Sequence, residues 1–230
     1  ANDRYPFGYF NSVTNGVRHT YALDKLYAAY QELAELEEFA DQPGDAWRLR
    51  ATTLRTAFHD PAHGYWPAGQ TWPIAWFRAD APPVTLLETF GVFEALRSGL
   101  IAPEDGAHYS ALMRTLHARL PELLDGPTPL RLAVGGYPAE LRRDVEPPVP
   151  LWMLDASAPW IVGLAAPAYA AAGYPADAEA IMQAYTRMAT TTDPPVLEFA
   201  AGAQAQYGAG DTGDRGRSWD SSAWFLAIYQ

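Results

Sequence analysis

The sequence predicts an all-α fold built from helical hairpins that are joined by long aromatic connections. Apolar residues recur at three- and four-residue spacing over most of the chain, which is the period of amphipathic helices. The chain contains 20 prolines, and most of them lie between these periodic stretches. Its 230 residues, of which 49% are hydrophobic and 19% charged, suffice for one helical domain with a buried core.

The first hairpin is predicted over residues 18–40 and 45–58. Between the two helices stand Pro43, Gly44 and Asp45, and proline and glycine are the residues that most often interrupt a helix. The apolar positions of the hairpin are Tyr21, Leu23, Leu26, Tyr27, Tyr30, Leu33, Leu36, Phe39, Trp47, Leu49, Leu54 and Phe58.

The second hairpin is predicted over residues 84–98 and from Pro103 to about Leu124. Gly99 suits the end of its first helix, because glycine adopts the left-handed conformation of a helix C-cap without strain. Pro103 suits the first turn of the next helix, where a missing backbone N–H costs nothing.

The third hairpin is predicted over residues 155–172 and 175–190, with a stop and a start at Gly173-Tyr174-Pro175. A seventh helix is predicted over 218–229, with Ser218 as its N-cap.

Three long connections separate these elements, at residues 59–83, 125–153 and 193–217. Connections of this length are usually functional or disordered, and their aromatic and charged content favours a functional role.

Composition excludes several classes of function. A net charge of −11 disfavours binding to nucleic acid or to anionic membranes, both of which require a basic face. No apolar stretch is long enough to cross a membrane as a helix. The absence of cysteine excludes disulfides and thiolate metal sites, and Gly135-Gly136 lacks the Lys and Ser/Thr of a phosphate-binding loop. The sequence therefore predicts no cofactor and no metal; His59, Asp60 and His63 lie in a Pro- and Gly-containing loop.

Three stretches resemble the six-hairpin glycosidases, whose fold is an (α/α) toroid. Residues 65–73, YWPAGQTWP, are similar to the Tyr-Trp loops of that superfamily. Trp152-Met153-Leu154-Asp155 resembles the segment that opens a hairpin in these enzymes. Residues 217–226, RSWDSSAWFL, resemble its closing helix. The resemblance implies a glycoside hydrolase acting on an oligosaccharide or polysaccharide. Because seven helices are too few for six hairpins, the expected fold is a partial or reduced toroid, and 1–230 one helical domain of it.

Glycoside hydrolysis requires two carboxyl groups that flank the scissile bond, one protonated and one ionised. Acids beside aromatic residues at the junctions of loops and helices are the candidates. Each has an alternative: Asp155 and Asp220 also suit helix N-caps, Glu88 could face outward or pair with an arginine, and Glu140 could be solvated. The candidate catalytic residues are Asp155, Glu88, Glu140 and Asp220.

Flat aromatic side chains can stack on the apolar faces of sugars, and histidine can bind their hydroxyl groups. The alternative is that some of these residues belong to the core. The candidate substrate-binding residues are Tyr65, Trp66, Trp72, Trp76, Trp152, His19 and Trp219.

Two other functions fit the same sequence. A polysaccharide lyase would use a cluster of Asn, His, Tyr and Arg, for which Tyr9, Asn11, Arg18 and His19 are the candidates. A non-catalytic module that binds sugar or packs against another chain fits the low number of helices. The sequence leaves the oligomeric state and the cellular location open.

Overall fold

The computed structural model describes residues 18–125, 129–137, 141, 156–157, 161–191 and 200–201. These residues are mostly helical, which confirms the all-α class for this part of the chain. Its α-helices are α1 (Thr20–Phe39), α2 (Asp45–Phe58), α3 (Thr89–Ser98), α4 (Ala107–Leu123), α5 (Val162–Ala171) and α6 (Pro175–Thr191). The strands are short: β1 (Arg18–His19), β2 (Trp76–Phe77), β3 (Ala156–Ser157) and β4 (Ala200–Ala201).

Most helix boundaries agree with the predictions to within about two residues, but three helices begin later than expected. Pro103 begins a short 3-10 helix, η2 (Pro103–Asp105), and α4 itself begins at Ala107, four residues after the predicted start. The helix predicted from residue 84 begins at Thr89, because Val84 forms a bridge with Trp76 and Glu88 forms one with Ala133. The helix predicted from residue 155 is preceded by β3 and begins at Val162. Gly99 ends α3 at a φ of 80°, as expected of a left-handed C-cap. The helix predicted at 218–229 lies outside the described residues.

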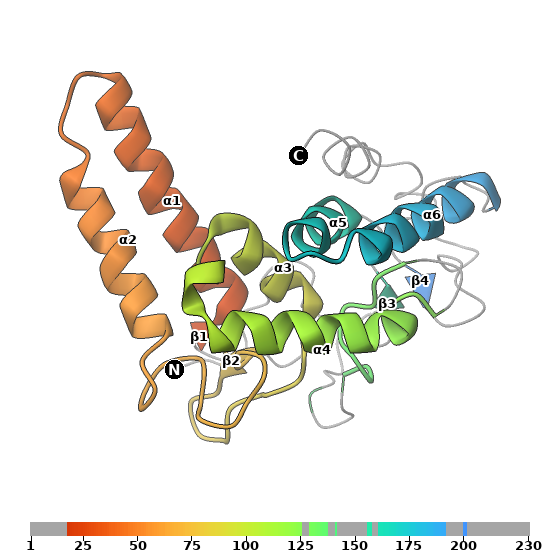
Figure 1. Ribbon diagram of the computed structural model, residues 1–230. Coiled ribbons are helices and arrows are strands. Elements are labelled where there is room, and N and C mark those ends of the chain that lie inside the picture. Colours follow the sequence, from red (N-terminus) through yellow and green to blue (C-terminus); the bar gives the residue numbers. More distant parts are fainter. Residues whose placement is uncertain are drawn as a thin grey trace, which may run out of the picture.

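The odd-numbered helices form a continuous series of contacts (Figure 1). α1 packs against both α2 and α3, α3 packs against α5, and α5 packs against α6. The first helices of the three hairpins therefore contact one another in the order of the sequence. With a neighbour on either side, α3 is the most enclosed, and every residue from Thr89 to Ala95 is buried.

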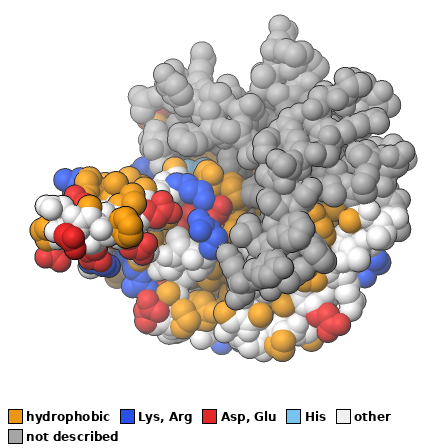
Figure 2. Space-filling model, turned by 90° about the horizontal axis from the view of Figure 1, so that it is seen from above, with side chains coloured by type: hydrophobic (Ala, Val, Ile, Leu, Met, Phe, Trp, Pro, Cys, Tyr) orange, Lys and Arg blue, Asp and Glu red, His pale blue; other side chains and the backbone are white. Residues whose placement is uncertain are grey.

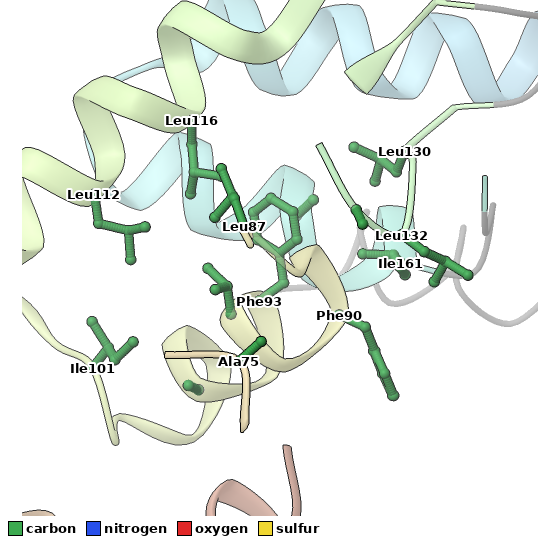
Figure 3. Close-up of a cluster of buried hydrophobic side chains, with 14 of the residues drawn as sticks. Ala75, Leu87, Phe90, Phe93, Ile101, Leu112, Leu116, Leu130, Leu132 and Ile161 are labelled. Atoms are coloured by element: carbon green, nitrogen blue, oxygen red, sulfur yellow. The ribbon is translucent and has the colours of Figure 1, made fainter. Parts of the chain in front are cut away.

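One hydrophobic core connects all six helices. Figure 3 shows its centre, where Leu112 and Leu116 of α4 extend toward Leu87 and Phe93. Ile161, at the start of α5, belongs to the same cluster, so the third hairpin shares this core with the first two. No boundary between separate cores divides these elements.

The three hairpins share one arrangement at the end where their first helices begin. β1, directly before α1, pairs with β2, which follows α2. Glu88, directly before α3, forms a bridge with Ala133, which lies beyond α4. β3, ahead of α5, pairs with β4, which lies beyond α6. The same chain geometry thus recurs three times without visible repetition in the sequence.

The first residues of α1 and α3 also make equivalent hydrogen bonds. Thr20 donates from its amide to Ala75 O (2.9 Å) and from its hydroxyl to Ile74 O (2.5 Å). Thr89 donates from its amide to Leu132 O (2.9 Å) and from its hydroxyl to Arg131 O (2.6 Å). Each threonine therefore attaches the start of its helix to the connection that follows the second helix of the same hairpin.

The α1–α2 hairpin projects from the rest of the described structure (Figures 1 and 2). Its outer part is held by the ion pair of Glu38 with Arg48 (2.6 Å) and by stacking of Tyr30 on Trp47. The large hydrophobic side chains that remain exposed in the described structure all lie on this hairpin: Leu26, Leu33, Leu36, Phe39 and Leu49. Among the helices described, none is both long and apolar enough to span a bilayer.

Candidate functional site

The N-terminal ends of α1 and α3 meet, and each is capped by a titratable side chain. His19 precedes α1, and its Nδ1 accepts a hydrogen bond from the amide of Tyr21 (3.1 Å). Glu88 precedes α3 and caps it in the same way. Gly91 permits the close approach, because a Cβ at this position would lie 2.7 Å from Glu88 Oε2 and 3.3 Å from Tyr21 N. The two helix starts therefore form one compact cluster.

Glu88 is the most unusual acid of this cluster, because it is buried to 2% exposure. Its Oε1 accepts from the amide of Phe90 (3.1 Å) and its Oε2 from the amide of Gly91 (2.8 Å). Burial raises the pKa of Glu88 to about 8, against the opposing effect of the two amides. At neutral pH the carboxyl group consequently retains its proton.

Aromatic rings link Glu88 to His19. Burial raises the pKa of Tyr137 well above its ordinary value, and the charge of Glu88 adds to that effect. Tyr137 neighbours Trp76, whose ring stacks on His19 at 5.2 Å between centroids. Burial lowers the pKa of His19 to about 4, so this imidazole is neutral at pH 7.

A pocket of about 480 Å³ opens at His19, between the first turns of α1 and the last turns of α2. We call it the hairpin-base pocket. Its polar side chains come from β1 and from the connection after α2: Arg18, His19, Asp60, His63 and Tyr65. Its apolar side chains come from the two helices: Ala22, Leu23, Leu26, Leu54, Ala57 and Phe58.

The structure separates the predicted substrate-binding residues. Tyr65 and His19 line the hairpin-base pocket. Trp66 and Trp76 are 1% and 0% exposed, so neither ring offers a face to a ligand as placed. Trp66 instead stacks on His108, with parallel planes and centroids 4.9 Å apart. Trp72 is partly buried and donates from Nε1 to Thr85 O (2.6 Å).

Of the predicted catalytic residues, the structure describes only Glu88. Its 2% exposure shows that it does not face outward, and among the described residues its carboxyl oxygens bond to backbone amides and pair with no arginine, the other alternative that the sequence allows. Asp155, Glu140, Asp220, Trp152 and Trp219 lie outside the described residues. Asp155 directly precedes β3 in the sequence.

Sequence reasoning missed a second buried carboxyl group, Asp24. It is 0% exposed, accepts a hydrogen bond from the hydroxyl of Ser98, and has its pKa raised to about 6, mainly by burial. Nearby, Glu94 pairs with Lys25 (2.7 Å) and with Arg97 (2.8 Å). The helical period was an available signal, because Asp24 shares the buried face of α1 with Thr20 and Tyr27.

Tyr137 was also missed. It follows two glycines in a long connection, and no local pattern marks such a residue as buried.

Within the described residues, no group of three or more His, Asp and Glu side chains is arranged to hold a metal ion. A scan against protein-family models and a search of curated proteins each returned no match for this chain.

Proposed function

We propose that the chain forms part of an (α/α) toroid and hydrolyses glycosidic bonds at the end where α1 and α3 begin. The observation that carries the proposal is Glu88, a buried carboxyl group with a pKa of about 8 at the start of a central helix. The fold supports it in two ways: the odd-numbered helices contact one another in order, and the strand pairing recurs in all three hairpins.

In this proposal Glu88 is the general acid, and its carboxyl group, 2% exposed among the described residues, must become accessible when substrate binds. A carboxyl group that keeps its proton at neutral pH can protonate the leaving oxygen of a glycoside. The protonated carboxyl group gains one O–H donor, and its oxygens can still accept the amides of Phe90 and Gly91. Asp155 is the proposed base, because it directly precedes β3, the counterpart of β1 in the third hairpin. Glu140 and Asp220 remain the other candidates for the base.

A polysaccharide lyase is the second candidate, and a specific observation favours it. Arg18 and His19, both expected in a lyase, lie together with Tyr65 at the hairpin-base pocket. Because the pKa of His19 is lowered to about 4 and its Nδ1 accepts the amide of Tyr21, the neutral imidazole carries its proton on Nε2, where it would donate a hydrogen bond to substrate. Arg18 would face the carboxylate of a uronic acid.

A screen over neutral and uronate-containing glycans separates these functions. Reducing ends and the ultraviolet absorbance of unsaturated products are measured in the same reactions. We expect new reducing ends without absorbance. Glu88→Gln should lower the rate about a hundredfold or more, as loss of a general acid does, while the exposed control Glu104→Gln should not. Absorbance would identify a lyase, and neither signal on a broad panel would contradict both functions.

A further inference from the structure

The hairpin-base pocket has the size and the walls of a small-molecule site. Small-molecule pockets typically measure about 300–1,000 Å³ and are mostly apolar with a few polar groups, and this pocket measures about 480 Å³. Leu23 of α1 faces it from one helix, and Leu54 and Phe58 of α2 from the other. Ala22 and Ala57 contribute only methyl groups, so the two helices leave room between them near the base of the hairpin.

Tyr65 brings a buried polar atom to this pocket. Its side chain is 4% exposed and is held between Phe58, on which it stacks at 5.2 Å, and Phe77, whose ring it meets edge-on at 4.9 Å. Among the residues that the structure describes, its hydroxyl group has no hydrogen-bond partner. Burying a hydroxyl group without a partner costs about 1–3 kcal/mol, so such groups usually have a specific reason.

Arg18 adds a positive charge at the same end of the pocket. Its guanidinium lies over the ring of Phe77, 4.0 Å from the centroid, and its charge acts on the phenol of Tyr65. No ion pair of Arg18 occurs within the described ranges of the chain. Burial raises the pKa of Tyr65 to about 12, so its hydroxyl keeps its proton and can donate. An O–H donor and a cation side by side are suited to an anionic acceptor.

The remaining polar side chains restrict the ligand further. Asp60 is ionised at neutral pH, because the amides of Ala62 (2.8 Å) and His63 (2.9 Å) donate to its Oδ1 and lower its pKa. A second carboxylate near Asp60 would be repelled. His19 is neutral at pH 7 and adds no charge. The pocket therefore suits one negative charge, placed at Arg18 and Tyr65.

We propose that the hairpin-base pocket binds a small amphiphilic monocarboxylate. Its aromatic or aliphatic body packs against Leu23, Leu54 and Phe58, and its carboxylate accepts the hydrogen bond of Tyr65 and faces Arg18. This site goes beyond the proposed hydrolase and competes with the lyase placed at the same pocket, because walls of this kind match a hydrocarbon body better than a ring covered with hydroxyl groups. It requires no catalytic step.

The test measures affinity by isothermal titration calorimetry for phenylacetate, phenylbutyrate and octanoate, with phenylbutyramide as the uncharged comparison. We expect at least one carboxylate to bind, and phenylbutyramide to bind more weakly than phenylbutyrate. Tyr65→Phe and Arg18→Gln should each weaken binding about tenfold or more, since each removes a partner of a charged group. The matched controls Tyr109→Phe and Arg50→Gln lie outside the pocket and should bind as the parent protein does.

Thermal unfolding of Tyr65→Phe supplies a second readout. Removing a buried hydroxyl group that bonds to none of the described residues should leave the melting temperature unchanged or raise it, so weaker binding would not reflect a damaged fold. Loss of affinity without loss of stability supports the site. The proposal is overturned if none of the three carboxylates binds, or if Tyr65→Phe and Arg18→Gln bind them as tightly as the parent. Both outcomes are independent of the glycan screen.

Discussion

His19 and Glu88 show how burial sets the charge of side chains in this protein. Each caps a helix at the same end of the structure, and each is driven toward its neutral form. For the acid this means a pKa raised to about 8, and for the base a pKa lowered to about 4. The cluster between α1 and α3 is therefore uncharged near neutral pH, although it contains two titratable groups.

The pH dependence of stability tests the state of Glu88. Between its ordinary pKa of 4.5 and its folded-state pKa of about 8, the folded protein keeps a proton that the unfolded chain has released. The free energy of unfolding should therefore fall as pH rises through this range. We expect Glu88→Gln to remove this contribution, because an amide does not titrate. Chemical denaturation at a series of pH values measures the slope.

The effect of Glu88 on stability is best separated from that of the other buried groups between pH 6.5 and 8. Asp24 also lowers the free energy of unfolding as pH rises, but only up to about its folded-state pKa of 6. His19 raises it as pH rises, but only up to about its ordinary pKa of 6.5. Glu88 alone of the three continues to act up to about pH 8. The exposed control Glu104→Gln should keep the parent slope. Equal slopes for Glu88→Gln and the parent would show that Glu88 is ionised in the folded protein.

At the scale of elements, the junctions at Thr20 and Thr89 define the hairpin unit. Both side chains are buried, and both donate to carbonyl oxygens of a segment more than forty residues away in the sequence. These bonds determine where the connections return to the starts of the helices. They thereby place Trp76 beside His19, and Ala133 beside Glu88.

Replacing these threonines by valine tests the junctions. The shape is kept, but a buried carbonyl oxygen loses its side-chain donor, so we expect Thr20→Val and Thr89→Val each to lower the free energy of unfolding by about 1–3 kcal/mol. Thr53→Val is the control, because the hydroxyl of Thr53 is exposed and bonds only to Leu49 O within its own helix. Urea titration measures all three. A change no larger than that of Thr53→Val would mean that the backbone pairing alone holds the junctions.

Local sequence patterns predicted the helices but not the segments that precede them. The Pro43-Gly44-Asp45 break and the apolar period placed α2 at its observed limits. Residues 84–88 continue the apolar pattern of α3 but are not helical, and Val84 and Glu88 form isolated bridges instead. Their partners, Trp76 and Ala133, are distant in sequence, and a period within one segment contains no information about such pairing.

At the scale of the whole molecule, one core joins the three hairpins. Its largest buried side chains include Trp66 and Trp76 from the first connection, together with Phe93 of α3 and Tyr169 of α5. The aromatic side chains of the sequence, which include 8 Trp and 13 Tyr, therefore serve two purposes. Some rings fill the core between hairpins, and Tyr65 reaches a pocket.

A continuous core predicts a single cooperative unfolding transition. We expect differential scanning calorimetry of the chain to give one peak whose calorimetric enthalpy equals the van't Hoff enthalpy. Far-ultraviolet circular dichroism and tryptophan fluorescence should report the same midpoint. Two separated transitions, with the projecting α1–α2 hairpin melting first, would instead show that this hairpin is an independent unit.

The sequence by itself determined the helical class, the order of the hairpins and most of their limits, because these depend on a short apolar period and on local Pro and Gly breaks. It also marked Glu88 as an unusual acid within an apolar stretch. Only the tertiary structure decided that Glu88 is buried at a helix start, that Trp66 and Trp76 are core residues, and that Tyr65 and Arg18 share a pocket. Burial and pairing arise from segments far apart in the chain, so they appear only when the hairpins pack together.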